Sequence, residues 1–418
     1  MVKKKFIPSK TYIPVSGKVY DKKEINNAIA AAKDCWWTEG RFAKEFESAF
    51  KKYMGVNYVT LVNSGSSANL VAVASLTSNV FGQRQLKPGD EFITCSTAFP
   101  TTVNPGIIYG LKPVFIDADL STLNIDITKL EKAVSKKTKL IMIAHTLGKP
   151  FDLDKVMKIV KKYNLWLIED CCDALGSRFD TKLVGTFGDI ATFSFYPAHQ
   201  ITMGEGGAVI TNKSLIHRSI RQFRDWGRDC WCDTGYDNTC GRRFDWKLGD
   251  LPRGYDHKYI YSQIGYNLKL TDFQAAIGVA QLKKLPQFIT RRKKNHNHLA
   301  AFFRKHSNYF SIIEHGQNDD PCWFGFAVIV KKVAPFSRNQ ITQYLEDNKI
   351  ATRTIFSGNL LRHPAYQKIK SRIVGKIVNA DIILENGFWI GVYPGIDNPR
   401  LTYMIKTLQK FLDASGRC

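Results

Sequence analysis

The alternation of short apolar runs with helix-like stretches between residues 58 and 212 constrains the fold of this chain most strongly. Helix-like segments such as 66–77, 127–136 and 154–164 separate the runs. Because the runs are apolar throughout rather than at every second position, they are typical of strands buried on both faces. The pattern predicts an α/β domain built on a central, mostly parallel sheet. The apolar runs cover residues 58–62, 91–95, 113–117, 140–144, 165–170, 191–195 and 208–211.

The remainder of the chain predicts a second, smaller domain. A length of 418 residues exceeds what one simple core usually holds. Residues 222–262 are rich in Asp, Gly, Trp, Arg and Cys and lack periodicity, which indicates a long loop insertion. A helix-like stretch follows and breaks near Pro286, and helix and strand patterns then alternate. We expect an N-terminal arm and a large domain over residues 1–287, which includes the insertion, and a smaller α+β domain over 288–418.

The formal net charge of +23 indicates an affinity for anions. Nucleic acid is one candidate, but the lysines are scattered and form no long basic block, so an anionic substrate such as a nucleotide sugar is favoured. Residues 1–18 are basic and lack the apolar stretch of a signal peptide, and no apolar run reaches the roughly 20 residues of a membrane helix. We therefore expect a cytoplasmic protein that binds neither nucleic acid nor a membrane.

A turn rich in glycine and serine, Asn63–Asn69, follows the first predicted strand and begins a helix. Gly65 permits close approach of the backbone. The amides of Ser66 and Ser67, together with the Ser66 hydroxyl, would face an anion at the helix N-terminus. The same residues are also good helix caps, so an ordinary capped helix stays open as an alternative.

Three further side chains suit a ring-shaped cofactor. Asp170 ends an apolar run, and ligands of open α/β sheets bind at that end of the strands. A carboxylate there could keep the nitrogen of a pyridine ring protonated and so make the ring an electron acceptor, although a solvated loop acid is the alternative. Phe99 could stack on such a ring or belong to the core. Ser194, five residues before His199, could donate to a phosphate.

These elements occur in one order, which resembles that of the DegT/DnrJ-type sugar aminotransferases. Those pyridoxal phosphate (PLP) enzymes have the fold of aspartate aminotransferase (fold type I), with a large domain around a mostly parallel sheet and a smaller α+β domain. The resemblance covers nearly the whole chain and implies a homodimer whose active sites form between the subunits. It implies phosphate binding by Gly65, Ser66, Ser67 and Ser194, ring stacking by Phe99, a contact of Asp170 with the pyridine nitrogen, and a contact of Asn267 with the cofactor phosphate of the neighbouring subunit.

His199 departs from that family pattern. In the segment from Thr192 to Gly207 the family has a lysine that holds the cofactor covalently, whereas this chain has a histidine. Imidazole cannot form that stable bond, but it transfers protons near neutral pH. We therefore expect lost transamination, a cofactor in the free pyridoxamine phosphate (PMP) form, and proton transfer by His199. By the same resemblance Tyr196 lines the active site.

Four of the nine cysteines follow the pattern C-x57-C-x-C-x7-C, at Cys172, Cys230, Cys232 and Cys240. Three of them lie in the predicted insertion and one follows Asp170, which suggests a site of four thiolates. The spacing by itself leaves zinc, an iron–sulfur cluster and unrelated thiols open. Within the same family, the combination of this histidine with these four cysteines resembles dehydratases that carry a [2Fe–2S] cluster, and it implies such a cluster here. We interpret the remaining cysteines as ordinary buried or incidental thiols: Cys35, Cys95, Cys171, Cys322 and Cys418.

The resemblance to this dehydratase branch implies removal of the C3 hydroxyl from a nucleotide-linked 4-keto-6-deoxyhexose, in the biosynthesis of 3,6-dideoxyhexoses and lipopolysaccharide O-antigen. A CDP-linked sugar is favoured, dTDP and GDP stay open, and Arg353 and His363 are candidates to border the nucleotide or to serve structure. A one-electron reduction would follow. Because the sequence has no convincing dinucleotide fingerprint, the electrons would come from an NAD(P)H-dependent flavin and iron–sulfur reductase that docks on the insertion.

Two alternatives stay open. One is a cluster-free PMP-dependent dehydratase that releases ammonia after removing the hydroxyl and needs no outside electrons. The other is a non-catalytic regulator of the same fold that binds nucleic acid, which would explain the positive charge but not the phosphate turn, Asp170 and the cysteines together.

Overall fold

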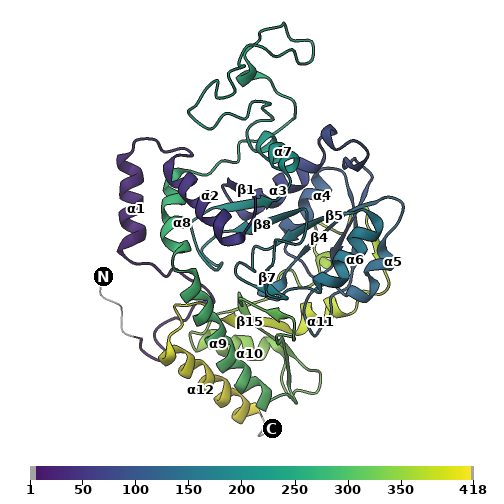
Figure 1. The fold of residues 1–418 in the computed structure, drawn as a ribbon. Coiled ribbons are helices and arrows are strands. Elements are labelled where there is room, and N and C mark those ends of the chain that lie inside the picture. The colour runs from purple at the N-terminus through teal and green to yellow at the C-terminus, as the bar shows by residue number, and fades with distance from the viewer. Residues whose placement is uncertain (1–5, 416–418) are drawn as a thin grey trace.

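A computed structural model describes residues 6–415, so the expectation for Cys418 lies outside the described residues. The predicted α/β architecture is confirmed, because helices cover both faces of a central sheet of eight strands (Figure 1). Neighbouring strands are parallel except in the two pairs that β9 forms with β1 and β8. The order is β1 (Tyr58–Val62), β9 (Gly207–Thr211), β8 (Ile190–Ser194), β5 (Trp166–Asp170), β4 (Thr138–Ala144), β2 (Glu91–Cys95), β3 (Lys112–Ile116) and β14 (Arg372–Val374).

The buried strands are apolar on both faces because each face supports its own hydrophobic core. In β4, Leu140 and Met142 belong to one core and Ile141 and Ile143 to the other. Successive side chains of a strand point to opposite faces, so a run without polar positions can face helices on both sides. One face carries α3 (Gly65–Leu76), α4 (Pro100–Ile108) and α7 (Ser214–Arg224), and the other carries α2 (Arg41–Met54), α6 (Leu153–Tyr163) and α8 (Asp272–Leu282).

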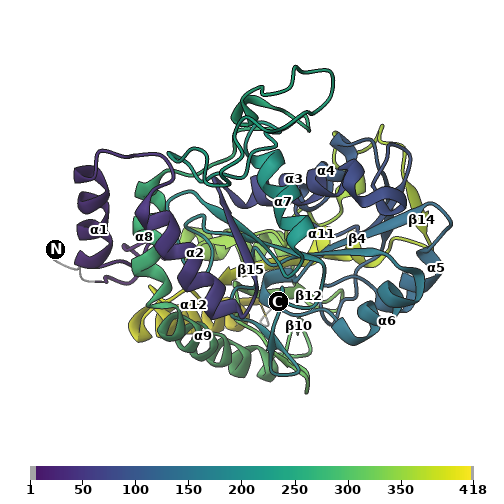
Figure 2. The same ribbon diagram turned by 45° about the horizontal axis from the view of Figure 1, so that its top comes forward.

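The second sheet is antiparallel and follows the long helix α9 (Leu285–Lys305). Its order is β10 (Phe310–Ile312), β12 (Gly325–Val330), β15 (Gly387–Gly391) and β13 (Thr352–Arg353). The helices α10 (Arg338–Asp347), α11 (Asn379–Asn386) and α12 (Asn398–Ser415) belong to this part; Figure 1 labels all three, and Figure 2 labels α11 and α12. The remaining elements are α1 (Lys22–Lys33), α5 (Leu130–Ala133), β6 (Arg178–Phe179), β7 (Lys182–Leu183), β11 (Asp319–Asp320), and 3-10 turns at Asn79–Arg84, Ile127–Lys129, Thr146–Gly148, His257–Tyr259 and Leu360–Arg362.

The parts of the chain before and after residue 287 contact each other at more than one place. Strand β14 returns from the second part to pair with β3, and Ile13 of the N-terminal arm forms a bridge to Ile350. One hydrophobic core also contains residues of both parts. The proposed division of the chain after residue 287 stays a prediction.

The predicted long helix is broken at 283–284, between α8 and α9. Pro286 lies in the first turn of α9, where a missing amide hydrogen removes no helical hydrogen bond. Helix α7 continues to Arg224, so the irregular insertion begins at 225 rather than at 222. Figure 1 shows that the insertion stands out from the body beyond α7. Among the helices of residues 6–415, none is both long and apolar enough to cross a membrane.

Candidate active site

A cavity of about 470 Å³ lies between the carboxyl ends of the large-sheet strands and the second sheet. In the register of the sheet, Asp170 at the end of β5 lies beside Ala144 of β4 and Thr192 of β8. The carboxyl edge of an open α/β sheet is where such folds bind ligands. The cavity is lined by Val15, Ser16, Gly65, Ser66, Phe99, Thr101, Thr102, Ala144, Asp170, Cys172, Asp173, Ser194, Tyr196, Ala198, His199, Phe324, Arg353, Thr354, Phe356 and Trp389.

Gly65 begins α3 where that helix meets the end of β8. A Cβ at this position would lie 2.4 Å from Ser194 Cβ and 3.1 Å from Cys172 Sγ, so the packing requires glycine. Ser66 follows and lines the cavity at the helix N-terminus. Ser67 is engaged within the turn instead, because its amide donates to Ser64 Oγ at 3.1 Å and its hydroxyl donates to Asn63 Oδ1 at 2.6 Å. Phosphate binding by Ser67 stays a prediction.

The carboxylate of Asp170 is buried and accepts three hydrogen bonds. Asn69 Nδ2 donates to Oδ2 at 2.8 Å, Thr102 Oγ1 donates to the same oxygen at 2.7 Å, and the Cys172 amide donates to Oδ1 at 3.1 Å. Asn69 Oδ1 accepts in turn from Thr192 Oγ1 at 2.6 Å. Three donors of this kind fix the orientation of the carboxylate. These supporting residues were not predicted from the sequence; the only signal was that Asn69 closes the Asn63–Asn69 turn.

His199 faces a second buried carboxylate, Asp173, which the sequence analysis also missed. Its Nδ1 lies 3.3 Å from Asp173 Oδ1, and the two side chains are 14% and 9% exposed. The contact is close but is not aligned as a hydrogen bond, and Asp173 Oδ2 has no partner among the described residues either. Burial raises the pKa of Asp173, although His199 opposes this shift. The run Asp170-Cys-Cys-Asp173 was the sequence signal for this second acid.

The backbone and the ring of His199 are held from the second part of the chain. Arg292 of α9 is buried and donates to the His199 carbonyl oxygen at 2.9 Å. The ring of Phe324 lies 5.3 Å from the imidazole, centroid to centroid. With Nδ1 directed at Asp173, Nε2 is the nitrogen left for a ligand in the cavity.

Two aromatic residues of the cavity wall are half exposed, Phe99 at 50% and Tyr196 at 51%. Exposed aromatic faces inside a concave site suit a flat ligand. Arg353 of β13 lines the same cavity, whereas His363 lies outside its lining, where its Nε2 contacts the Ser357 carbonyl oxygen at 2.8 Å.

Asn267 lies outside the cavity lining. Its Oδ1 accepts from Lys269 Nζ at 2.8 Å, and its backbone forms a bridge with Asp225 at the base of the insertion. Its implied contact with a neighbouring subunit stays a prediction.

The four patterned cysteines divide into two places. Cys172 lines the cavity, and none of the other three does. In the insertion the Cys232 amide donates to Cys230 Sγ at 3.4 Å, and Cys232 Sγ contacts the hydroxyl of Thr239, the neighbour of Cys240, at 3.1 Å. An N–H to sulfur contact is typical of thiolate ligands, and among the insertion cysteines Cys230 has one.

The spacing of these cysteine sulfurs does not fit a compact tetrahedral zinc site. Zn–S bonds of about 2.3 Å bring all ligand sulfurs to roughly 3.8 Å from one another. Among the described residues, the only set of three or more metal-type ligand atoms within 4.8 Å of one another is His145, Glu169 and Cys171, which excludes the patterned cysteines. Glu169 of that buried set already has hydrogen-bond partners within the protein. It accepts from the amides of Gly185, Phe187 and Gly188 and contacts His145 at 3.1 Å.

The cavity suits a phosphorylated pyridine that is not covalently attached. It offers a helix N-terminus with Ser66 and Ser194 for the phosphate, the Asp170 carboxylate for a ring nitrogen, and the Phe99 face for the ring. Two buried polar atoms that have no hydrogen-bond partner among the described residues, His199 Nδ1 and Asp173 Oδ2, lie at the same wall. No lysine of the described residues lines the cavity, so the lining provides no amine to hold a cofactor.

The fold and this site define a vitamin B6 enzyme. The chain belongs to the DegT/DnrJ/EryC1/StrS aminotransferase family, whose model matches residues 18–409. It has the α/β fold of the PLP-dependent members of that family.

Among curated proteins, the chain is 50% identical over 408 residues to the lipopolysaccharide biosynthesis protein RfbH of Salmonella typhimurium, covering 98% of this chain and 93% of the relative. It is 45% identical over 411 residues to dTDP-4-dehydro-2,6-dideoxy-D-glucose 3-dehydratase of Saccharopolyspora spinosa, covering 98% and 89%. Among solved structures, GDP-4-keto-6-deoxy-D-mannose-3-dehydratase of E. coli with bound hydrated PLP matches with a TM-score of 0.84 and 31% identity, covering 95% of this chain and 99% of that one.

Proposed function

We propose that this enzyme is a PMP-dependent 3-dehydratase that removes the C3 hydroxyl from a nucleotide-linked 4-keto-6-deoxyhexose. The observation that carries the proposal is the pairing of His199 with Asp173 in a cavity that has no lysine in its lining. Relatives named as 3-dehydratases of sugar nucleotides support it. We favour CDP-4-keto-6-deoxy-D-glucose as the substrate, with a role in making 3,6-dideoxyhexoses for lipopolysaccharide. The name of the RfbH relative supports the lipopolysaccharide part of this proposal.

When bound, PMP supplies a free amine that reacts with the sugar ketone and a ring that accepts electrons. His199 Nε2 would take the proton from the carbon next to the ring and return a proton to the departing oxygen. Asp173 would hold Nδ1 and balance the charge that the imidazole gains. Asp170 would keep the pyridine nitrogen protonated, and Ser66 and Ser194 would hold the phosphate. Arg353 is the cation of the lining that could meet the substrate phosphates.

We also propose that Cys172, Cys230, Cys232 and Cys240 hold a [2Fe–2S] cluster, which supplies single electrons when it is present. Three cysteines within residues 230–240 and the N–H to sulfur contact at Cys230 support this assignment. Among the described residues these sulfurs belong to no set of three or more metal-type ligand atoms within 4.8 Å of one another, which disfavours compact zinc. A separate NAD(P)H-dependent reductase would deliver the electrons, and a homodimer would bring Asn267 to the neighbouring site.

Replacing His199 with Asn tests the catalytic assignment. The purified variant should still bind PMP but should lose exchange of the C4′ hydrogen of PMP with solvent, measured in D₂O with CDP-, dTDP- and GDP-linked 4-keto-6-deoxyhexoses. Unchanged exchange would exclude His199 as the base. Iron and sulfide assays on the anaerobically purified wild type separate the cluster-containing enzyme from one that releases ammonia without a cluster.

A further inference from the structure

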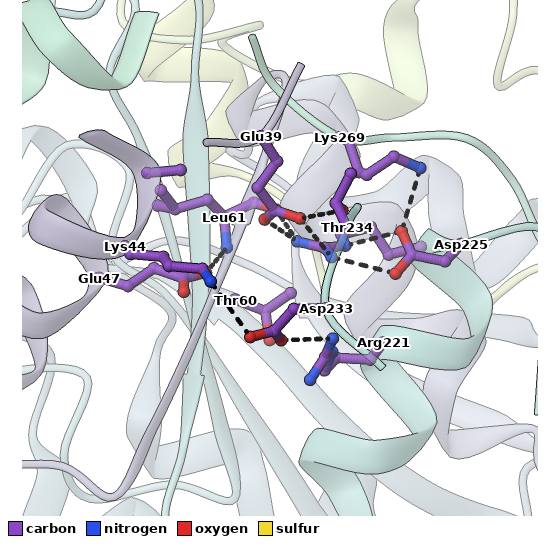
Figure 3. A network of polar contacts seen from close by, with 12 residues as sticks. Glu39, Lys44, Glu47, Thr60, Leu61, Arg221, Asp225, Asp233, Thr234 and Lys269 are labelled. Carbon is purple, nitrogen blue, oxygen red and sulfur yellow. Dashed lines mark hydrogen bonds and ion pairs between the residues drawn. The ribbon is translucent and has the colours of Figure 1, made fainter. Parts of the chain in front are cut away.

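The cysteine-bearing segment Cys230–Cys240 contacts the catalytic body at Glu39, which belongs to a buried ion pair with Arg224; Figure 3 labels Glu39 and Thr234 of that segment. Arg224 ends α7, and its side chain is only 3% exposed; Glu39, in the loop between α1 and α2, is 12% exposed. Arg224 donates from its NH1 nitrogen to Glu39 Oε1 at 2.6 Å and from its NH2 nitrogen to Oε2 at 3.0 Å. Such a bidentate pair fixes direction as well as distance.

Glu39 also contacts the cysteine-bearing segment itself. Its Oε2 accepts from the Thr234 hydroxyl at 3.0 Å, and Thr234 stands two residues after Cys232. Arg224 donates further to the Leu61 carbonyl oxygen at 3.1 Å, near the end of β1. The Glu39 carboxylate therefore connects Thr234, through Arg224, to the strand that precedes the phosphate turn.

The two aspartates that flank Cys230 and Cys232 are both held by helix α7. On one side Asp229 accepts from Gln222 at 3.1 Å and pairs with Arg218 at 3.3 Å. On the other side Asp233 pairs with Arg221 at 3.3 Å, and with Lys44 of α2 at 3.5 Å. Figure 3 shows Asp233 between the Arg221 and Lys44 side chains.

The outer part of the insertion is held by contacts within itself. Arg243 donates to Asp256 at 2.9 and 2.6 Å, and Lys258 pairs with Asp237. A loop of this length without regular structure carries a large conformational entropy unless specific contacts restrict it. The position of Cys230 and Cys232 relative to the body therefore depends on the contacts at residues 229, 233 and 234.

We propose that Glu39 is a positioning residue for the thiolate site, acting through Thr234 and Arg224 to hold Cys230 and Cys232 over α7. The inference rests on the proposed iron–sulfur centre. Glu39 itself donates no electron pair to a metal in this arrangement, because both of its oxygens are occupied by Arg224 and Thr234. Residues that orient ligands in this way commonly alter metal retention when they are replaced.

Thr234→Val tests the contact with almost no change in side-chain volume, and Thr234→Ser keeps the hydroxyl as the matched control. Each protein is reconstituted anaerobically with Fe²⁺ and sulfide, and the loss of cluster absorbance to a chelator is timed. We expect Thr234→Val to lose the cluster roughly ten-fold faster than wild type, and Thr234→Ser to stay within about two-fold. Glu314→Gln, in the surface pair with Arg304, should behave as wild type.

A second measurement does not need a metal. In the apo protein, mass spectrometry of labelled peptides gives the rates at which Cys230 and Cys232 react with a thiol reagent. Thr234→Val should raise both rates, while Cys35, an exposed thiol outside the segment, should react as in wild type. Equal labelling of Cys230 and Cys232 in Thr234→Val and wild type would overturn the inference. If wild type takes up no iron, the proposed cluster fails, whereas unchanged labelling rates in Thr234→Val show by themselves that Glu39 does not position the segment.

Discussion

His199 Nδ1 and Asp173 Oδ1 lie 3.3 Å apart in a wall of the cavity that also contains Asp170. The two acids are separated by two residues in sequence and serve different partners. Asp170 accepts from Asn69, Thr102 and the Cys172 amide, whereas Asp173 faces the imidazole. This arrangement assigns one carboxylate to the proposed pyridine ring and the other to the proposed base.

Asp173→Asn should slow proton transfer by roughly 100-fold while leaving PMP affinity nearly unchanged, because an amide cannot balance the charge that His199 gains. The measurement is exchange of the C4′ hydrogen with solvent, followed over pH. Asp173→Glu should restore part of the rate, and Asp154→Asn, at an exposed acid of α6, should have no effect. A loss of thermal stability without a change in the pH profile would show that Asp173 is merely structural.

Gly65→Ala should lower both stability and PMP affinity. The added Cβ would lie 2.4 Å from Ser194 Cβ, which forces the start of α3 away from β8. Overpacking of this kind costs about 1–3 kcal/mol. Urea unfolding and PMP titration measure the two effects. Gly316→Ala is the matched control, since its nearest neighbouring atom would be 3.5 Å from the new Cβ. Equal behaviour of the two variants would contradict the packing at Gly65.

Cys232→Ser should remove most of the iron from anaerobically purified protein while dehydration continues. A serine hydroxyl is a poor replacement for a thiolate, and Cys232 does not line the cavity. Iron analysis and detection of the dehydrated product give the two readouts. Cys35→Ser, at an exposed thiol outside the pattern, should keep the iron of wild type. Full iron content in Cys232→Ser would remove this residue from the ligand set.

Glu47→Gln should change how stability depends on pH. Burial, with Glu39 nearby, raises the pKa of Glu47 to about 7 from the ordinary value of 4.5. Between these values the folded chain keeps a proton that the unfolded chain has lost, so the free energy of unfolding falls as pH rises through this window. Glutamine lacks this titration and can still accept from the Leu61 amide, which contacts Glu47 at 3.1 Å.

Between pH 4.5 and pH 8 the Glu47 titration should lower the free energy of unfolding of wild type by up to about 3 kcal/mol. The same titration is missing from Glu47→Gln, so the variant should gain stability relative to wild type by this amount. Urea unfolding at several pH values measures it. Glu45→Gln, at an exposed acid of the same helix, should show no such shift. A difference that is constant with pH would mean that Glu47 titrates normally.

The sequence predicted the large sheet well because buried parallel strands must be apolar at every position. The runs at 58–62 and 91–95 coincide with β1 and β2, and the others differ by one or two residues at their ends. The site was partly predictable for the same reason. Residues at the carboxyl ends of such strands must meet at one edge, so Gly65, Asp170 and Ser194 converge.

The partners of these residues could not be predicted from the sequence. Thr102 reaches Asp170 across 68 positions, and Arg224 reaches Glu39 across 185. Both contacts depend on how helices pack on the sheet, which hydrophobic periodicity does not specify. Asp173 lies three residues after the predicted Asp170, but its contact with His199 depends on where the loop that carries His199 is placed.

The sequence by itself determined which chemical groups this protein possesses: a histidine in place of the family lysine, a turn rich in glycine and serine, a strand-end acid and four spaced cysteines. Tertiary structure decided which of them share a site. Side-chain type and local periodicity act over a few residues, whereas a cavity is formed by packing between segments far apart in the chain. That is why His199, Asp173 and Cys172 line one cavity, while Thr234, in the insertion that carries Cys230, Cys232 and Cys240, contacts Glu39.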